Sequence, residues 1–190
     1  YRRNKNGLVT FLDKKGLSWE GDNLVNYNGF DFYYSTEGSL IASCPEGEKR
    51  INKENCFIRI GADYIIYKNQ AAHLLSFESS PVALWVDGTI YPLIVDHLGS
   101  IKGMLDPSGK SLLWTRHYSD WGKKRVTYNL KSKENVKELE ELTVWSYASL
   151  LEVPGVNGSH QLYFSSSRIY SPNIKEWLSP DTKVNISLYL

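Results

Sequence analysis

The chain has 190 residues and is 42% hydrophobic, so it can bury a substantial core and wholesale disorder is disfavoured. Its 22 basic and 21 acidic residues leave a net charge of +1. This balance argues against general binding of nucleic acids or anionic membranes, because such binding needs a basic excess. Aromatic residues reach 13% and suit the pleated, half-buried surface of β-strands.

Short apolar stretches separated by turn residues recur about every ten positions, which is the pattern of an all-β chain. No apolar run is long enough to span a bilayer, and no Gly/Ser-rich linker divides the chain. The stretches predict strands at Gly7–Leu12, Leu24–Tyr27, Phe30–Tyr34, Leu40–Ser43, Cys56–Ile60, Tyr64–Tyr67, His73–Phe77, Ile101–Leu105, Leu112–Tyr118 and Leu162–Phe164.

The cysteines Cys44 and Cys56 are compatible with two states. They form a disulfide that closes a short loop, or they remain two ordinary thiols. The second state is favoured, because a secreted disulfide scaffold would be richer in cysteine. No Cys or His pair has the short spacing of a metal site, and no motif indicates a cofactor.

The segment Ala83–Val95 contains the clearest hairpin. Asp87 and Gly88 lie between two runs of β-branched and aromatic residues, and both tolerate the positive φ that a type I′ turn requires. The sequence therefore predicts two antiparallel strands joined by a two-residue turn.

The segment Ser132–Leu151 differs from the rest of the chain. Val136, Leu139 and Leu142 recur at three-residue steps among Lys and Glu residues, which predicts a surface helix. The alternative is a charged loop that becomes a strand at Leu142–Tyr147.

A degenerate repeat runs through the chain: a short polar residue, two free positions and then glycine. In a type I turn the first side chain accepts a backbone N–H two residues on, and the glycine takes up positive φ at the exit. One such hairpin is barely stable, whereas repetition lets neighbours pair and bury a shared face. The repeat occurs at Asn4–Gly7, Asp13–Gly16, Ser35–Gly38, Asp106–Gly109 and Ser119–Gly122.

Residues 96–122 begin with Asp-His-Leu-Gly-Ser and continue with two of these turns. This run resembles the repeat-associated core of the Rhs or tyrosine–aspartate (YD) repeat family. Tyr34–Leu40 is similar to one of the family's repeats, and Gln161–Asp181 is similar to its closing motifs. The chain departs from the family pattern at Ser171, Lys175, Glu176 and Thr182.

The resemblance implies an all-β strip of antiparallel hairpins with one short helix. Residues 1–95 would be degenerate repeats and residues 96–190 the core-like region of one continuous unit. In this family such strips build shells that enclose a C-terminal toxin or effector, as in competition between bacteria. The implied chain is a non-catalytic, secreted or cell-surface wall segment. Its implied partners are the remainder of a larger shell, the cargo and a secretion-system component, with no nucleic acid and no membrane span.

The alternative from another functional class is a surface adhesion module that binds carbohydrate or protein. The chain has 13 Tyr and 6 Trp residues, and such side chains anchor interfaces. Aromatics gathered on one exposed face would favour adhesion, whereas aromatics buried between hairpins would favour the shell.

The resemblance also implies roles for individual residues. Asp181 is the low-ranked candidate for self-cleavage in a longer chain, because some shells of this family cleave themselves with acidic residues near the end; an ordinary turn aspartate is the alternative. The residues with an implied structural role are Asp96, His97, Leu98, Gly99, Ser100, Asp106, Gly109, Tyr118, Gly122, Arg168, Tyr170 and Pro172.

Asp96 and His97 also have the composition of an acid–base pair. Adjacent residues on a strand point to opposite faces, so a turn aspartate beside a packed histidine is favoured. Arg116 and His117 alternate within Leu112–Tyr118 and are expected at solvated or inward-facing positions rather than in a catalytic site.

Overall fold

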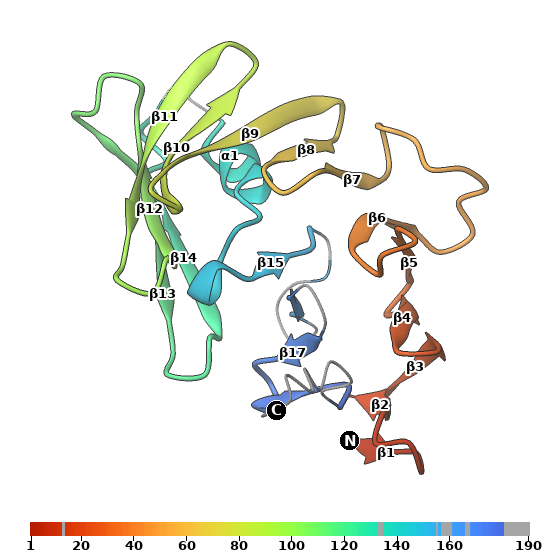
Figure 1. Cartoon of the computed structure of the whole chain (residues 1–190). Coiled ribbons are helices and arrows are strands. Elements are labelled where there is room, and N and C mark those ends of the chain that lie inside the picture. Colours follow the sequence, from red (N-terminus) through yellow and green to blue (C-terminus); the bar gives the residue numbers. More distant parts are fainter. Residues whose placement is uncertain (13, 133–134, 155, 157–160, 166–167, 181–190) are drawn as a thin grey trace, which may run out of the picture.

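The computed structural model describes residues 1–12, 14–132, 135–154, 156, 161–165 and 168–180. Within these residues, fourteen strands form one antiparallel sheet, the strip, in which each strand pairs with the next along the chain (Figure 1). The strands are β1 (Arg2–Arg3), β2 (Val9–Leu12), β3 (Lys15–Glu20), β4 (Asn23–Tyr27), β5 (Phe30–Tyr34), β6 (Leu40–Pro45), β7 (Phe57–Ile60), β8 (Tyr64–Tyr67), β9 (Gln70–Phe77), β10 (Ser80–Val86), β11 (Thr89–Val95), β12 (Ile101–Leu105), β13 (Leu112–Tyr118) and β14 (Lys124–Tyr128).

The repeated turns have the geometry that their residue types predict. At four of the five expected sites the glycine N–H donates to the carbonyl of the polar residue at 2.8 to 3.0 Å, and each of these glycines has a positive φ. At Asp106, the carboxylate oxygen also accepts from the N–H groups of Lys110 and Ser111 at 2.9 and 3.0 Å. The four sites are Asn4–Gly7, Ser35–Gly38, Asp106–Gly109 and Ser119–Gly122.

The turn predicted at Asp13–Gly16 is wrong. Gly16 lies inside β3, opposite Phe11 of β2, and Lys14 has the positive φ, 64°. The connection between these strands is therefore shorter than the repeat predicts. Asp13 itself lies outside the described residues.

The predicted hairpin at Ala83–Val95 is confirmed. β10 pairs with β11, with Val86 opposite Thr89. Asp87 and Gly88 form the connection with φ values of 46° and 90°, as a type I′ turn requires.

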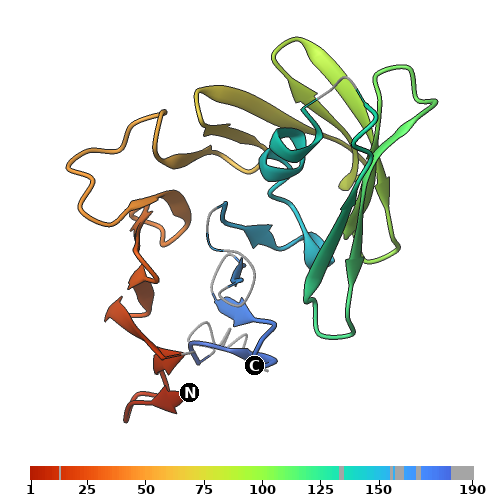
Figure 2. The same cartoon turned by 180° about the vertical axis from the view of Figure 1, so that it is seen from behind.

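The strip curves around a second, smaller antiparallel sheet (Figures 1 and 2). Within the described residues this inner sheet has four strands, β15 (Leu151–Glu152), β16 (Tyr163–Phe164), β17 (Ile169–Ser171) and β18 (Glu176–Trp177). The inner sheet meets the first strands of the strip: the N–H of Val9 donates to the carbonyl of Leu178 at 2.9 Å, and Arg3 forms an ion pair with Glu176 at 2.7 Å.

Helix α1 (Val136–Leu142) confirms the predicted helix, and the alternative strand at Leu142–Tyr147 is wrong. After the helix, Trp145 forms an isolated bridge with Leu151, and a short 3-10 turn, η1 (Tyr147–Ser149), leads into the inner sheet. Among the described residues, no helix has the length and apolar character needed to cross a membrane.

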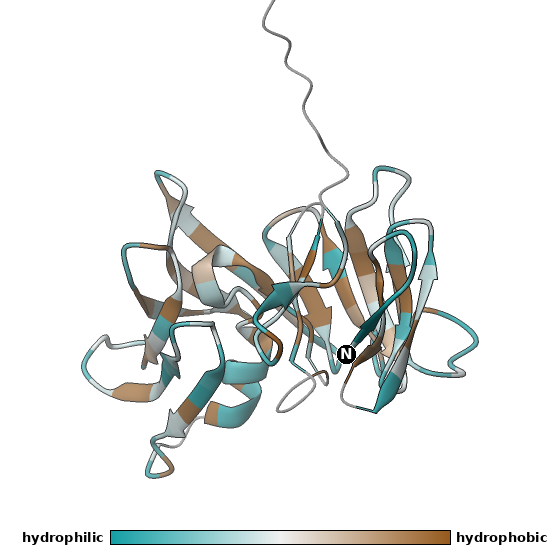
Figure 3. Cartoon of the chain, turned by 90° about the horizontal axis from the view of Figure 1, so that it is seen from below, coloured by the Kyte–Doolittle hydropathy of each residue, from teal (hydrophilic) through white to brown (hydrophobic). Residues whose placement is uncertain are grey.

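One hydrophobic cluster joins the strip, α1 and the inner sheet. Leu24 and Ile101 contribute from the strip, Leu142 from the helix, and Val153 and Leu162 from the segments beside the inner sheet. Hydrophobic and hydrophilic residues alternate along the strands (Figure 3), so one face of the strip packs inward while the other meets solvent.

A disulfide joins Cys44, in β6, to Cys56, immediately before β7. Both residues are fully buried, and their Cα atoms are 4.3 Å apart. The favoured interpretation as two ordinary thiols therefore does not hold in this structure. The bond fixes the pairing of β6 and β7 at the base of the charged loop between them.

Candidate functional site

The loop Asp96–Ser100 joins β11 to β12 and is a further copy of the polar-x-x-glycine turn. The N–H of Gly99 donates to the carbonyl of Asp96 at 3.0 Å, and Asp96 Oδ1 accepts from the N–H groups of Leu98 and Ser100 at 3.0 and 2.9 Å. Burial opposes ionisation of Asp96, yet these N–H donors hold the pKa of its carboxyl below the usual value. The carboxylate is engaged in the turn, and the side chain of His97 is exposed.

The same loop holds the chain where it enters the inner sheet. The N–H of Ala148 donates to Ser100 Oγ at 3.0 Å, and Ser149 Oγ donates to the carbonyl of Gly99 at 3.3 Å. Ala148 and Ser149 both have positive φ, 49° and 60°, a conformation that costs non-glycine residues free energy. A Cβ at Gly99 would overlap Ser149 Oγ, so a side chain there would displace this hydroxyl from the carbonyl that it contacts.

The turn between β13 and β14 is held by three tyrosines, which we call the tyrosine clamp. They come from η1 and from two strands of the inner sheet, and they donate to three successive carbonyl groups of one turn. The clamp therefore docks the inner sheet onto the end of the strip. Its bonds run from Tyr147 to Asp120 at 3.0 Å, from Tyr170 to Trp121 at 3.0 Å, and from Tyr163 to Gly122 at 2.7 Å.

Tyr118, at the end of β13, belongs to the same contact region. Its hydroxyl donates to the carbonyl of Ile101 at 3.0 Å and lies 3.0 Å from Ser146 Oγ. The ring of Tyr118 also packs against that of Tyr147, with the centroids 5.7 Å apart. This tyrosine therefore links the strip, through β12 and β13, to the segment that follows α1.

The other residues marked by the sequence are distributed more widely. Arg168 stacks on Trp177, with its guanidinium carbon 4.2 Å from the ring centroid, and Pro172 is buried after β17. The turn that contains Asp106 and Gly109 stands apart, with open space around the glycine. Asp181 lies outside the described residues.

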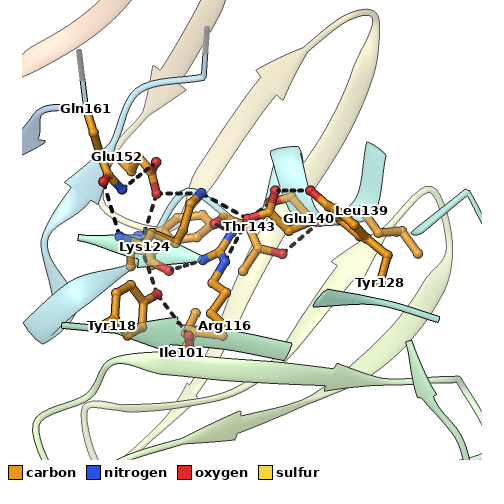
Figure 4. A network of polar contacts seen from close by, with 12 residues as sticks. Ile101, Arg116, Tyr118, Lys124, Tyr128, Leu139, Glu140, Thr143, Glu152 and Gln161 are labelled. Carbon is orange, nitrogen blue, oxygen red and sulfur yellow. Dashed lines mark hydrogen bonds and ion pairs between the residues drawn. The ribbon is translucent and has the colours of Figure 1, made fainter. Parts of the chain in front are cut away.

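Arg116, on the inward face of β13, is 1% exposed and caps the C-terminal end of α1 (Figure 4). Its Nε donates to Glu140 Oε1 at 2.8 Å. Its terminal nitrogens donate to the carbonyls of Glu140, Thr143 and Trp145 at 2.8, 2.6 and 3.3 Å. A cation at this end of a helix interacts favourably with the carbonyl groups of the last turn.

Lys124, on β14, extends the contacts of Arg116 to the inner sheet. Its Nζ lies 3.0 Å from Glu140 Oε1 and 2.9 Å from Glu152 Oε2. Glu152, on β15, also accepts from Ser146 Oγ at 3.0 Å and from Gln161 Nε2 at 3.0 Å. The four charged residues Arg116, Lys124, Glu140 and Glu152 form what we call the inner network.

The charges of the inner network stabilise one another. Burial alone would raise the pKa of Glu140, but Arg116 and Lys124 lower it below the usual glutamate value. Burial opposes the charge of Arg116 as well, and the nearby carboxylate of Glu140 nevertheless raises the pKa of the guanidinium. Burial and Glu140 raise the pKa of Tyr128 to about 12. Two cations and two carboxylates thus balance in the interior.

The inner network holds parts of the fold together and has little room for a substrate. The cavity beside Arg116, Lys124 and Glu152 has a volume of about 40 Å³, which is enough for a few water molecules. Both carboxylates are occupied by hydrogen bonds and ion pairs. Across the described ranges, no group of three His, Cys, Asp or Glu residues could hold a metal ion.

Three members of the inner network were not found from the sequence. Charged residues usually lie at the surface, and Arg116 alone was expected at a solvated or inward-facing position; it faces inward and is buried. One signal was available: Val136, Leu139, Glu140 and Thr143 have the i, i+3, i+4, i+7 spacing of an inward helix face. Glu140 therefore lies on the buried stripe of α1.

Comparison with known proteins finds likeness in fold alone. No protein-family model and no curated protein matches the chain. The crystal structure of TcdB2–TccC3 is 16% identical with a TM-score of 0.67, covering 95% of this chain and 10% of that chain. The Photorhabdus luminescens Tc holotoxin pore with a mutation in TccC3 is 15% identical with a TM-score of 0.67, covering 96% of this chain and 10% of that one.

A third solved structure, TcdB2–TccC3 without the hypervariable C-terminal region, gives a similar result. It is 15% identical with a TM-score of 0.62, and the match covers 91% of this chain and 9% of that chain. The chain therefore spans about a tenth of the length of the solved chains that it matches. These neighbours are parts of toxin complexes, and their likeness shows that this chain has the fold of a segment of them.

Proposed function

We propose that the chain is a non-catalytic wall segment of a larger Rhs-type β-shell, which encloses or presents a C-terminal toxin or effector. The observation that carries the proposal is the meandering strip that curves around an inner sheet (Figure 1). The tyrosine clamp and the inner network fix the strip to this sheet, and Figure 4 shows the inner network. The likeness in fold to toxin-complex chains supports it.

In this proposal residues 1–95 are wall repeats, and residues 96–190 are the core-like region that turns inward. The loop Asp96–Ser100 and the turn at Gly122 are the two points where the wall holds the inner sheet. The buried disulfide between Cys44 and Cys56 supports a secreted or cell-surface location, because disulfides persist in oxidising surroundings.

The proposed partners are the remainder of the shell, its cargo and a component of a secretion system. Competition between bacteria is the proposed setting. Each strand of the strip pairs with the next along the chain, so the strip can extend by adding further hairpins. This property suits enclosure more than chemistry.

Neither alternative gains support of equal weight. An adhesion module needs aromatics gathered on one exposed face. The strongly exposed aromatics of the described chain are instead scattered over the residue before β1, β2, the end of β9 and the turn after β13. Self-cleavage would rest on Asp181, which lies outside the described residues. The exposed aromatics are Tyr1, Phe11, Phe77 and Trp121.

The proposal is tested on the full-length natural polypeptide that contains this chain. We expect a hollow particle in electron microscopy, and we expect its C-terminal region to resist added protease until the protein is denatured. A natural product that consists of this chain alone and runs as a compact monomer in size-exclusion chromatography would overturn the proposal. A C-terminal region cleaved as fast as an unfolded peptide would also overturn it.

A further inference from the structure

A cavity of about 270 Å³ lies between the strip and the inner sheet. Arg59, on β7, lines it from the strip, and Leu151 and Phe164, on β15 and β16, line it from the inner sheet. Trp145, Leu150 and three serines, Ser39, Ser149 and Ser165, complete the lining. The cavity thus combines large apolar side chains with hydroxyl groups and one cation, and small-ligand sites combine apolar walls with a few polar groups in the same way.

Arg59 differs from the other arginine that faces inward. Every nitrogen of the Arg116 guanidinium takes part in a hydrogen bond or an ion pair. The Nε atom of Arg59 is buried without a hydrogen-bond partner, and the described part of the chain offers this guanidinium no ion pair within contact distance. A buried donor that lacks a partner is costly and calls for an explanation.

The electrostatics of the cavity favour an anion. Burial lowers the pKa of Arg59, and Asp63, in the turn after β7, opposes this effect from a distance. Among the described residues, no acidic side chain lines the cavity. The half-buried guanidinium therefore has no acidic partner inside the cavity, and its positive charge attracts a negative group.

Two of the neighbouring polar groups are already engaged, which leaves Arg59 as the charged recognising group. Trp145 Nε1 donates to the carbonyl of Ala62 at 3.2 Å, and Ser149 Oγ donates to the carbonyl of Gly99 at 3.3 Å. An incoming ligand would therefore meet one guanidinium, the hydroxyl groups of Ser39 and Ser165, and the apolar side chains of Leu151 and Phe164.

We propose that this cavity binds a carboxylate carried on an apolar body, with the carboxylate accepting hydrogen bonds from the guanidinium of Arg59. A planar guanidinium matches a carboxylate in geometry, and the apolar lining fits a leucine-sized group. Such a ligand is either the carboxyl end of a peptide or an acidic side chain. The proposal holds whether or not the chain belongs to a shell.

The test is a titration of the isotopically labelled chain with small probes. The NMR signal of the Arg59 Nε–H group reports the binding of each probe. N-acetyl-leucine represents a chain end, and the α-amide of N-acetyl-glutamic acid represents an acidic side chain. N-acetyl-leucinamide is the neutral control for the first. We expect a carboxylate probe to shift the Nε–H signal in a saturable way and the neutral amide to leave it unchanged. The carboxylate probe that binds more tightly shows whether the natural ligand is a chain end or an acidic side chain.

The variant Arg59→Met removes the charge and keeps much of the volume, and we expect it to weaken binding at least about tenfold. Arg50→Met, in the exposed loop before β7, is the matched control and should bind as the wild type does. The proposal is overturned if no probe shifts the Arg59 signal in the wild type, if the neutral amide shifts it equally, or if Arg59→Met binds normally. The wild-type titration decides even where the variant fails to fold.

Discussion

Gly122 is subject to two constraints, whereas most of the turn glycines are subject to one. Its φ is +82°, which side chains other than glycine rarely adopt, and a Cβ there would lie 2.7 Å from Tyr147 Cδ1. Gly109 occupies the same turn position in the preceding hairpin with φ +70°, and nothing lies within 4 Å of the place of its Cβ. Substitutions at these two glycines therefore distinguish the cost of a positive φ from the cost of crowding.

We predict that Gly109→Ala destabilises the protein by about 1 kcal/mol, because the unfavourable positive φ of alanine is the only cost at this position. Gly122→Ala should cost roughly a further 1–3 kcal/mol, because the methyl group must also displace the ring of Tyr147. Urea unfolding of the two variants measures the difference. Equal losses would show that the ring moves aside freely and that the clamp is loose.

At the scale of single residues, the sequence predicts what depends on local geometry. The spacing of a polar residue and glycine identifies four turns correctly, because the side chain and the glycine act on the same four residues. It fails at Asp13–Gly16, where pairing of Gly16 with Phe11 outweighs the local preference. It also does not reveal which glycine meets a ring from a distant segment.

The tyrosine clamp joins two elements, the β13–β14 turn and the inner sheet. Tyr163 is fully buried, and its hydroxyl donates to the carbonyl of Gly122 while accepting from Gln161 Nε2 at 2.8 Å. Tyr170 makes a single bond at the exposed side of the same turn, to Trp121. The two tyrosines thus make similar contacts at different depths.

We predict that Tyr163→Phe costs roughly 1–3 kcal/mol, because it removes the hydroxyl that donates to the buried carbonyl of Gly122 and one of the two acceptors of Gln161 Nε2. Tyr170→Phe, the matched control, should cost less than about 1 kcal/mol, because water replaces its hydroxyl. Unfolding experiments give the free energies. Amide exchange in the inner sheet should accelerate in Tyr163→Phe alone, and unchanged exchange there would contradict a docking role for the clamp.

At the scale of elements, the strip is largely predictable, whereas in the inner sheet only β16 was predicted, as a strand at Leu162–Phe164. The hairpin at Asp87–Gly88 forms between neighbours in sequence, so its turn and its apolar runs are sufficient to predict it. β3 and β14 have few apolar residues and were missed. β15, β17 and β18 have two or three residues each, and they depend on contacts with the strip that no local pattern contains.

At the scale of the whole molecule, the inner network is where the strip, α1 and the inner sheet meet. Arg116 and Lys124 come from the strip, Glu140 from the helix and Glu152 from the inner sheet. Breaking a buried ion pair by removing one partner is far more costly than breaking a surface pair. The stability of the assembled fold should therefore depend on the ionisation of Glu140.

The folded pKa of Glu140 lies below the ordinary value of 4.5. Its ionised form therefore contributes stability at neutral pH, and this contribution is lost as the pH falls through 4.5 and then through the lower folded pKa. Glu140→Gln should lose roughly 3 kcal/mol at neutral pH and should show a flatter fall in stability toward acid than the wild type. Urea unfolding across this pH range measures both effects.

Glu141→Gln is the matched control, because Glu141 is the next residue of the helix and pairs with Lys68 at an exposed site, with side-chain exposures of 40% and 48%. A surface pair of this kind contributes less than about 1 kcal/mol, so its removal should leave the pH profile nearly unchanged. If both variants behaved alike, the acid sensitivity would come from the sum of surface carboxylates. If only Glu140→Gln flattened the profile, the ionised carboxylate of Glu140 would be the group that stabilises the contact between the inner sheet and the strip.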